Sequence, residues 1–155
     1  MIEVHEVVRE PVATSEQLVL PFELRQKSRL RATTVAGTEL ALLLPRGTVL
    51  RDGDRLRAVN GLVIAVQAAA ESVSTARSDD VARFARVCYH LGNRHMPLQV
   101  GNGWLRYLAD HVLDRMVTEL GLTVVHEQAA FEPEAGAYHQ HDRAGSGVYL
   151  RHHGH

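Results

Sequence analysis

The sequence of 155 residues contains a single cysteine, Cys88. One cysteine excludes an internal disulfide framework and every metal site that needs several thiolates. The chain also lacks an apolar run of about 18 residues, the minimum for a membrane-spanning helix, so we expect no membrane partner. Its 17 Lys and Arg balance 18 Asp and Glu, a net charge of −1. Nucleic-acid-binding surfaces are strongly basic, so we expect no nucleic-acid partner.

The first residues, Met1 to Glu6, are acidic where a signal peptide would be basic and then apolar, which predicts a cytoplasmic protein. The length suits one compact domain or two small ones of roughly 70 residues each. Histidine is the abundant residue. The chain has ten histidines, and five of them fall within residues 139–155.

Short β-prone runs separated by turn residues fill the first 70 residues and predict a small sandwich or barrel. The clearest of these runs are 17–20, 29–35, 38–44, 55–59 and 62–67. Asn60-Gly61 separates the last two runs. This dipeptide favours a two-residue hairpin turn in which both residues have positive φ.

From residue 71 onward, β-prone runs alternate with amphipathic helical segments. The predicted order is strand 71–77, a helix ending near Gly92, strands 96–100 and 104–108, a second helix, and strand 122–127. Residues 104–108 also fit a continuation of the second helix. The order βαββαβ is that of a ferredoxin-like domain. We therefore predict an α+β fold with a β-rich domain at 1–70, a ferredoxin-like domain at 71–138 and a flexible tail at 139–155.

Capping residues and apolar spacing define the two predicted helices. Ser78 is the expected N-cap of the first helix, and Gly92 and Asn93 are expected to end it in left-handed conformations that place His95 on an exposed corner. Its expected inner stripe is Val81, Phe84, Ala85, Cys88 and Leu91. The second helix is expected to begin after Asp110 and end at Gly121, with an inner stripe of Val112, Leu113, Met116, Val117 and Leu120. On its stripe, Cys88 is expected to be a packed small hydrophobe rather than a reactive thiol.

The tail carries two histidine clusters, and we interpret them as metal ligands. They are His139 with His141, and His152, His153 and His155. In an extended segment, residues i and i+2 point the same way about 7 Å apart, so two imidazoles can share one ion. Imidazole suits nickel, copper and zinc, and an open histidine site favours a metal that is carried and handed on. The isolated His5 and His126 are interpreted as ordinary surface residues.

Several short motifs follow one another along the chain. They are Leu44-Pro45-Arg46-Gly47, Asp52-Gly53-Asp54, His90-Leu91-Gly92-Asn93-Arg94-His95, Pro97-Leu98-Gln99, Asp110-His111-Val112-Leu113-Asp114, Leu120-Gly121-Leu122, and Phe131-Glu132-Pro133-Glu134 with Gly136-Ala137-Tyr138. Together they resemble the family of urease accessory nickel chaperones, UreE.

The resemblance implies a protein-binding N-terminal domain and a ferredoxin-like C-terminal domain that forms a homodimer. The histidine of its Gly-Asn-Arg-His motif falls on His95, which would meet its symmetry mate to bind Ni²⁺; Zn²⁺ and Cu²⁺ are alternative ions for the same site. His139 and His141 would complete the shell, His152, His153 and His155 would gather metal, and His111 would be a peripheral ligand. His90 also matches a family histidine and is interpreted as structural.

By the same resemblance, the protein would deliver nickel to urease and catalyse nothing. Its partners would be the urease accessory GTPase and the urease activation complex, and whether dimers pair into metal-linked tetramers stays open. The chain departs from some members at Ala109, where they carry a further histidine two positions before His111.

Two other functions compete with this interpretation: a general histidine-rich metal buffer and a metal-dependent hydrolase. A hydrolase needs fixed ligands and an activated water, and the sequence has no compact triad such as His-Glu-x-x-His. Glu132 and Glu134 are interpreted as a connection to the tail rather than as catalytic acids. A basic cluster of Arg25, Lys27, Arg29 and Arg31 is either a solvated strand face or a docking patch for an acidic partner.

Overall fold

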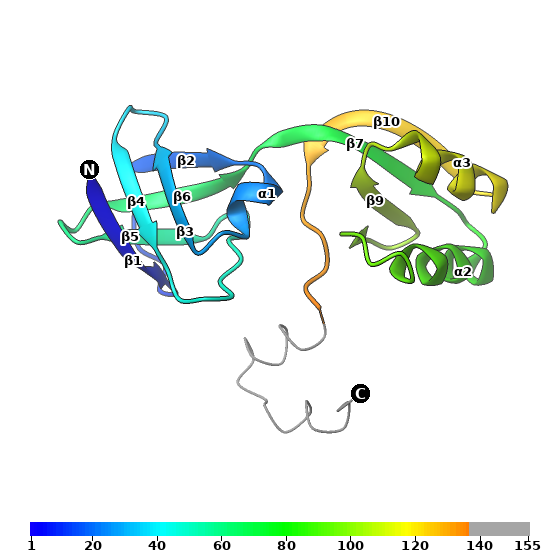
Figure 1. Cartoon of the computed structure of the whole chain (residues 1–155), viewed down its shortest axis with the longest axis horizontal. Coiled ribbons are helices and arrows are strands. Elements are labelled where there is room, and N and C mark those ends of the chain that lie inside the picture. Colours follow the sequence, from blue (N-terminus) through cyan, green and yellow to red (C-terminus); the bar gives the residue numbers. More distant parts are fainter. Residues whose placement is uncertain (137–155) are drawn as a thin grey trace, which may run out of the picture.

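The structure, a computed structural model, describes residues 1–136 and forms two lobes (Figure 1). An N-terminal lobe is built on a six-stranded sheet and a C-terminal lobe on a four-stranded sheet. β7 (Ala70–Arg77) leads from the first lobe into the second, and residues 131–136 pass between the two lobes (Figure 1). The predicted tail and its five histidines lie outside the described residues.

The N-terminal sheet has the strand order β2-β6-β5-β1-β4-β3. Its strands are β1 (Ile2–Val8), β2 (Glu16–Leu20), β3 (Arg29–Thr33), β4 (Glu39–Leu43), β5 (Arg55–Ala58) and β6 (Val63–Ala68), with the short helix α1 (Phe22–Arg25) after β2. The sheet curls so that its edge strands β2 and β3 approach each other. The Val35 N–H, just after β3, donates to the carbonyl of Gln17 in β2 at 2.9 Å. Alternate residues such as Leu18, Leu40 and Leu56 are fully buried inside the curl, so the prediction of a β-rich lobe is confirmed.

The turn at Asn60-Gly61 differs from the prediction. Gly61 has φ +92°, but Asn60 does not share a positive φ, since His95 is the only non-glycine among residues 1–136 that has one. Gly61 N–H donates to the Ala58 carbonyl at 2.9 Å, and Ala58 N–H donates to Leu62 at 2.8 Å. The loop is therefore a three-residue turn with one left-handed residue, a geometry that needs glycine only at its last position.

The C-terminal lobe confirms the predicted α+β fold with a ferredoxin-like order. Its remaining elements are α2 (Val81–Gly92), β8 (Gln99–Val100), β9 (Trp104–Leu108), α3 (His111–Glu119) and β10 (Thr123–Ala130). The sheet order is β10-β7-β9-β8, and every neighbouring pair is antiparallel. Residues 104–108 thus form a strand, not an extension of the following helix.

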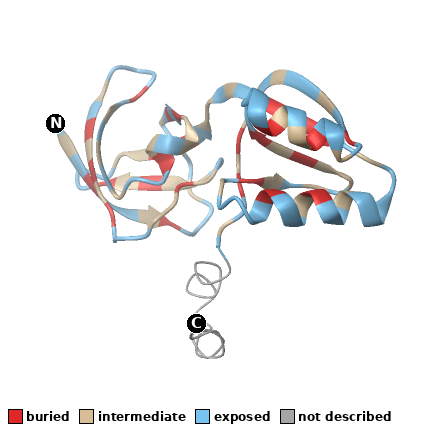
Figure 2. Cartoon of the chain, turned by 45° about the vertical axis from the view of Figure 1, so that its right-hand side comes forward, coloured by how far each residue is buried: buried red, intermediate tan, exposed pale blue. Residues whose placement is uncertain are grey.

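Helix α2, the first of the two helices predicted for this lobe, begins two residues later than predicted. Its N-cap is Asp80, whose Oδ1 accepts the Arg83 N–H at 3.0 Å, so Ser78 as the N-cap is wrong. The inner face consists of Phe84, Val87, Cys88 and Leu91. Val81 was expected on that face but is 83% exposed, and Ala85 is also exposed. Val87, which the predicted stripe omitted, is fully buried in the core of this lobe, and Figure 2 shows buried residues along the helices of the lobe in red.

Helix α3, the second predicted helix, begins after Asp110 as predicted. Asp110 Oδ1 accepts the N–H groups of Val112 and Leu113 at 2.8 and 3.1 Å. Leu113 and Val117 are buried, with Met116 and Leu120 packed beside them. Val112 was expected on the inner face but is 60% exposed, whereas its neighbour Leu113 is buried, so Val112 lies on the solvent side of the helix. None of the helices in the described part of the chain is both long and apolar enough to cross a membrane.

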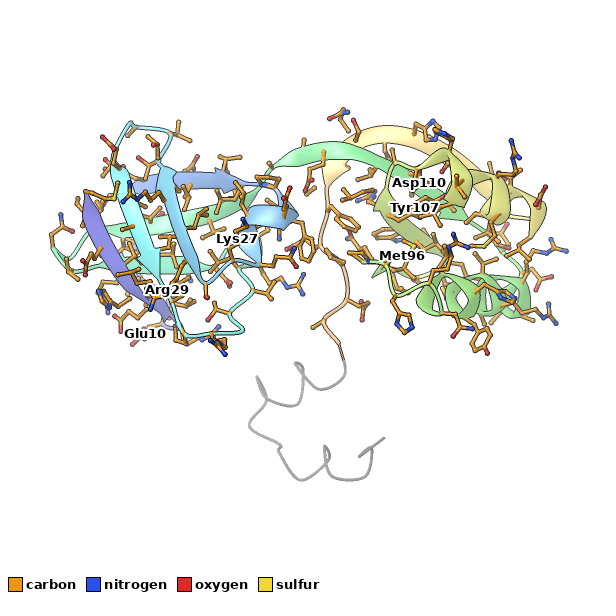
Figure 3. All side chains as sticks on the ribbon, viewed as in Figure 1. Glu10, Lys27, Arg29, Met96, Tyr107 and Asp110 are labelled. Atoms are coloured by element: carbon orange, nitrogen blue, oxygen red, sulfur yellow. The ribbon has the colours of Figure 1, made fainter. Side chains whose placement is uncertain are left out.

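The predicted basic cluster does not exist as a single surface. Arg25 is fully buried, whereas Lys27, Arg29 and Arg31 are exposed. Lys27 and Arg29 are labelled on the N-terminal lobe in Figure 3. Arg25 ends the short helix α1, which turns its side chain inward toward residues distant in sequence. The interpretation of Arg25 as part of a solvated strand face or docking patch is therefore wrong.

Candidate metal centre

His95 lies on the loop that follows α2, and this loop has an unusual end. The residues after Gly92 continue in right-handed turns: Asn93 has φ −64°, and the Arg94 and His95 N–H groups donate to Leu91 and Gly92 at 3.1 and 3.0 Å. The chain reverses only at His95, which has φ +55°. The left-handed conformation expected at Gly92 and Asn93 is thus found at His95 instead.

The reversal at His95 places this residue on an exposed corner, as predicted. Positive φ is uncommon outside glycine, although histidine is among the residues that adopt it more often. Three residues later the chain is buried again at Leu98. Met96, the residue next to His95, is labelled in Figure 3 beside the C-terminal end of α2. His95 is therefore an exposed imidazole on a short loop fixed at both ends.

The structure does not bring the other described histidines to His95 as a closed site. His90 is exposed, and its ring packs edge-on against Tyr89 with centroids 5.4 Å apart. His111 is exposed in the first turn of α3. Within residues 1–136, no group of three or more His, Cys, Asp or Glu side chains is arranged to hold a metal ion. The described residues therefore form no closed metal site by themselves.

The exposed side of α2, the helix that ends at the His95 loop, carries an apolar stripe beside the exposed Arg83 and Arg86. Val81, Ala85 and Tyr89 follow one another at four-residue spacing and are all exposed, Val81 by 83% and Tyr89 by 65%. Residues at this spacing lie on one side of a helix. This stripe reaches from the start of the helix to within six residues of His95.

Residues 131–136, which we call the strap, run next to the segment that follows His95. Glu134 N–H donates to the Leu98 carbonyl at 2.8 Å, and Glu132 N–H donates to Gln99 Oε1 at 2.9 Å. In Figure 1 the C-terminal end of α2 faces the strap, shown in orange. The sequence indicated that these residues connect the last strand to the tail, but it did not reveal that they are fixed beside the His95 loop.

Residues 2–69 match the N-terminal domain of the UreE urease accessory protein, and residues 71–155 match its C-terminal domain. The chain belongs to the UreE family. The resemblance drawn from the sequence motifs is thereby confirmed.

Several relatives carry the same name, urease accessory protein UreE. The protein from Alkalilimnicola ehrlichii is 63% identical over 121 residues, which cover 78% of this chain and 74% of the relative. That from Marinobacter nauticus is 50% identical over 135 residues, covering 81% and 75%. That from Proteus mirabilis is 54% identical over 121 residues, covering 78% and 75%. The family is one of accessory proteins of urease.

A polar cluster of Tyr107, Asp114 and His126 links α3 to the sheet. The Tyr107 hydroxyl donates to Asp114 Oδ1 at 2.7 Å, and His126 Nε2 lies 2.6 Å from Asp114 Oδ2. Burial of Asp114 alone would raise its pKa, but its hydrogen bonds outweigh this effect and the pKa falls below its usual value. The buried Ser74 hydroxyl meets no partner in hydrogen-bond geometry, so Tyr107 and His126 supply those bonds.

The buried Tyr107 hydroxyl makes this cluster important for the stability of the C-terminal lobe. Its side chain is fully buried, and burial raises the pKa of its phenol well above the usual value, so the hydroxyl stays a donor. Figure 3 labels Tyr107 near Asp110, at the start of α3. The sequence analysis treated His126 as an ordinary surface residue and did not identify its bond to Asp114.

We expect Asp114→Ala to lower the free energy of unfolding by about 2 kcal/mol at pH 7, because it leaves the buried Tyr107 hydroxyl without an acceptor. The lowered pKa of Asp114 means that its contribution is complete above the unfolded-state pKa of about 3.9 and is lost as the pH falls through the folded-state value. The difference between wild type and variant should therefore shrink below about pH 4. Urea unfolding followed by Trp104 fluorescence measures it.

Adding Tyr107→Phe to Asp114→Ala provides the control for this prediction. Removing the hydroxyl as well as its acceptor should recover part of the lost stability, because no buried donor is then left unpaired. Equal stability of wild type and Asp114→Ala at pH 7 would contradict the assigned role of the cluster.

Proposed function

We propose that the protein is a nickel metallochaperone that binds Ni²⁺ between two chains and delivers it for assembly of the urease active site. The observation that carries the proposal is His95, an exposed imidazole on a rigid loop without further ligands from its own described residues. A twofold interface presents the same residue twice. Two copies of His95 would therefore form a bridging site that one chain lacks.

The apolar stripe on α2 supports a homodimer. Val81 and Tyr89 are exposed by 83% and 65%, and an isolated monomer gains nothing from apolar side chains of this size in water. Burying the stripe against its symmetry mate would bring the two His95 loops toward one axis.

Tail histidines would complete the coordination shell. His139 and His141 are the proposed completing ligands, His152, His153 and His155 would gather metal, and His111 would be peripheral. Imidazole nitrogens suit Ni²⁺, and also Cu²⁺ and Zn²⁺, which are the alternative ions. The attachment of the strap beside Leu98 supports this arrangement, since the chain continues toward His139 from that point.

The proposed partners are the urease accessory GTPase and the urease activation complex; the relatives' name, urease accessory protein, supports the link to urease alone. A cavity of about 430 Å³ lies between the N-terminal lobe and the strap, and three arginines (Arg9, Arg46 and Arg51) against two carboxylates (Asp54 and Glu134) line it. Such a cavity suits an acidic segment of a partner protein.

On this proposal the protein is not an enzyme. The rival hydrolase needs three fixed ligands and an activated water, and the rival metal buffer needs only the tail. We propose the division into 1–70, 71–138 and 139–155 as the corresponding functional units: partner binding, metal binding with dimerisation, and metal capture.

Calorimetric titration with Ni²⁺, combined with mass measurement in solution, tests the proposal on the full chain. We expect a dimer that binds one tight nickel ion per two chains, with weaker sites filling later. A protein that is monomeric with and without nickel would contradict the proposal. Uniform weak binding that disappears when the tail histidines are replaced by alanine would favour the metal buffer instead.

A further inference from the structure

The cavity between the N-terminal lobe and the strap is lined by residues from three of the sequence motifs that the candidate metal centre does not use. Arg46 and Gly47 come from the motif at 44–47, Asp54 from the motif at 52–54, and Glu134 from the motif that begins at Phe131. These motifs are far apart in the sequence. The fold therefore brings to one place several motif residues for which nickel binding gives no reason.

In the motif Leu44-Pro45-Arg46-Gly47, all residues but one have a structural role. Leu44 is buried in the core of the lobe. The Pro45 carbonyl accepts the N–H and the hydroxyl of Thr48 at 3.1 and 2.6 Å, and Gly47 has φ +86°, which glycine adopts without strain. Arg46 is exposed, and its side chain makes no hydrogen bond or ion pair with another of residues 1–136. The turn thus places a guanidinium without a structural partner on the cavity wall.

The other charged side chains of the cavity divide into engaged and available groups. Arg51 and Asp54 are engaged, since Asp54 Oδ2 accepts the Arg51 N–H and Arg51 Nη1 donates to a strap carbonyl, both at 2.8 Å. Arg9 is exposed and, within the described part of the chain, makes no such bond. An anion in the cavity would therefore be attracted by Arg9 and Arg46 and repelled by Glu134.

The cavity also has an apolar part and a fixed wall. Val7, Phe22 and Val49 line it and are half-buried. The strap is held against the lobe, because the buried Arg25 donates through Nη1 to Glu132 Oε1 at 3.0 Å. A volume of about 430 Å³ lies within the range of small-ligand pockets. A ligand that combines a negative charge with an apolar group would use both parts.

We propose that Arg46, together with Arg9, binds the carboxylate of an acidic residue in a partner protein, while an apolar residue beside it in the partner packs on the apolar part of the cavity. A guanidinium suits this task because its fork of donors matches a carboxylate, whereas a lysine offers only a point charge. The inference deepens the proposed function and rests on it, since a chaperone must dock on a partner to hand on its metal.

The experiment titrates three probes into the full-length protein and follows its backbone amides by NMR. The probes are acetyl-Leu-Glu-Leu-amide, the neutral counterpart acetyl-Leu-Gln-Leu-amide, and inorganic phosphate. We expect the glutamate peptide to shift the amides of residues 46–49 and to bind about tenfold more tightly than the glutamine peptide, because hydrogen bonds to charged groups are the stronger ones. Phosphate should bind more weakly than the glutamate peptide, since it gains nothing from the apolar part.

Substitutions of opposite expected effect separate ligand binding from stability. Arg46→Met should weaken binding of the glutamate peptide about tenfold, and Arg46→Lys, which keeps the charge without the fork, should weaken it less. Glu134→Gln should strengthen binding about threefold, because it removes the repelling carboxylate. Arg31→Met is the matched control, since it removes the same charge from an exposed position of the same lobe that does not line the cavity. It should leave the affinity unchanged.

Equal binding of the two peptides, an unchanged affinity in Arg46→Met, or the same loss in Arg31→Met would each overturn the inference. Phosphate that binds as tightly as the glutamate peptide would indicate a general anion site and would overturn the assignment to a partner segment. Nickel titration distinguishes these failures from failure of the proposed function. Loss of the peptide result with a tight nickel site retained overturns only the inference, whereas unchanged nickel binding in His95→Gly overturns the function on which it rests.

Discussion

Replacing His95 with alanine is expected to weaken tight nickel binding by more than about 100-fold, since changes outside the ligand shell alone commonly cost 10- to 100-fold. Because the proposed site uses His95 twice, one substitution removes both bridging imidazoles. The ligand lies on an exposed corner, so its loss leaves no cavity in the core. We therefore expect the chain to remain folded and dimeric.

The left-handed backbone at His95 requires a second variant. With φ +55°, an alanine at this position is strained by about 1 kcal/mol relative to glycine. His95→Gly removes the imidazole without that strain and separates loss of the ligand from distortion of the loop. Both variants should lose the tight site in calorimetry and keep the wild-type mass in solution.

His90→Ala is the matched control, because His90 is an exposed histidine five residues earlier and lies on the helix rather than on the loop. It should retain the tight site. If His95→Gly kept the affinity and stoichiometry of the wild type, the bridging site would have to be abandoned. If both histidine variants lost nickel to the same degree, His90 would have to be counted as a ligand.

Local signals predicted most of the fold. Asp110 was identified as an N-cap because its short carboxylate can accept from the first turn of a helix, and the structure shows those bonds. The ferredoxin-like order followed from apolar periodicity, which reports burial against a sheet. Spacing alone placed some residues on the wrong side of a helix: Val112 fits the predicted stripe by its position in the sequence, but its side chain is 60% exposed.

The residues around the candidate site and the strap were harder to predict because their environment is nonlocal. Arg25 pairs with Glu132, 107 positions away in the sequence, and its neighbours in sequence suggested an exposed basic strand. His95 was placed correctly on a corner, but its left-handed conformation was assigned to Gly92 and Asn93. Glycine permits that conformation without requiring it, and the turn bonds at Arg94 and His95 delay the reversal.

Phe131→Ala is expected to lower the free energy of unfolding by about 3–5 kcal/mol, the usual cost of removing a buried phenylalanine side chain. Phe131 is fully buried and packs edge to face against Phe22 with centroids 5.8 Å apart. It also holds in place the carbonyl that accepts from Arg25. A cavity here would weaken both the apolar contact and the buried ion pair beside it.

Phe131→Leu is the control, since it retains most of the apolar volume and should cost about 1 kcal/mol. Urea unfolding measures both variants, with Trp104 fluorescence following the C-terminal lobe and far-ultraviolet circular dichroism following both lobes. If the strap joins the lobes, the two probes should coincide in the wild type and separate in Phe131→Ala, because each lobe has its own hydrophobic core. Two results together would contradict this role of Phe131: a decrease in the free energy of unfolding below about 1 kcal/mol for Phe131→Ala, which is less than its buried area implies, and probes that still coincide. The contacts that join the lobes would then lie elsewhere.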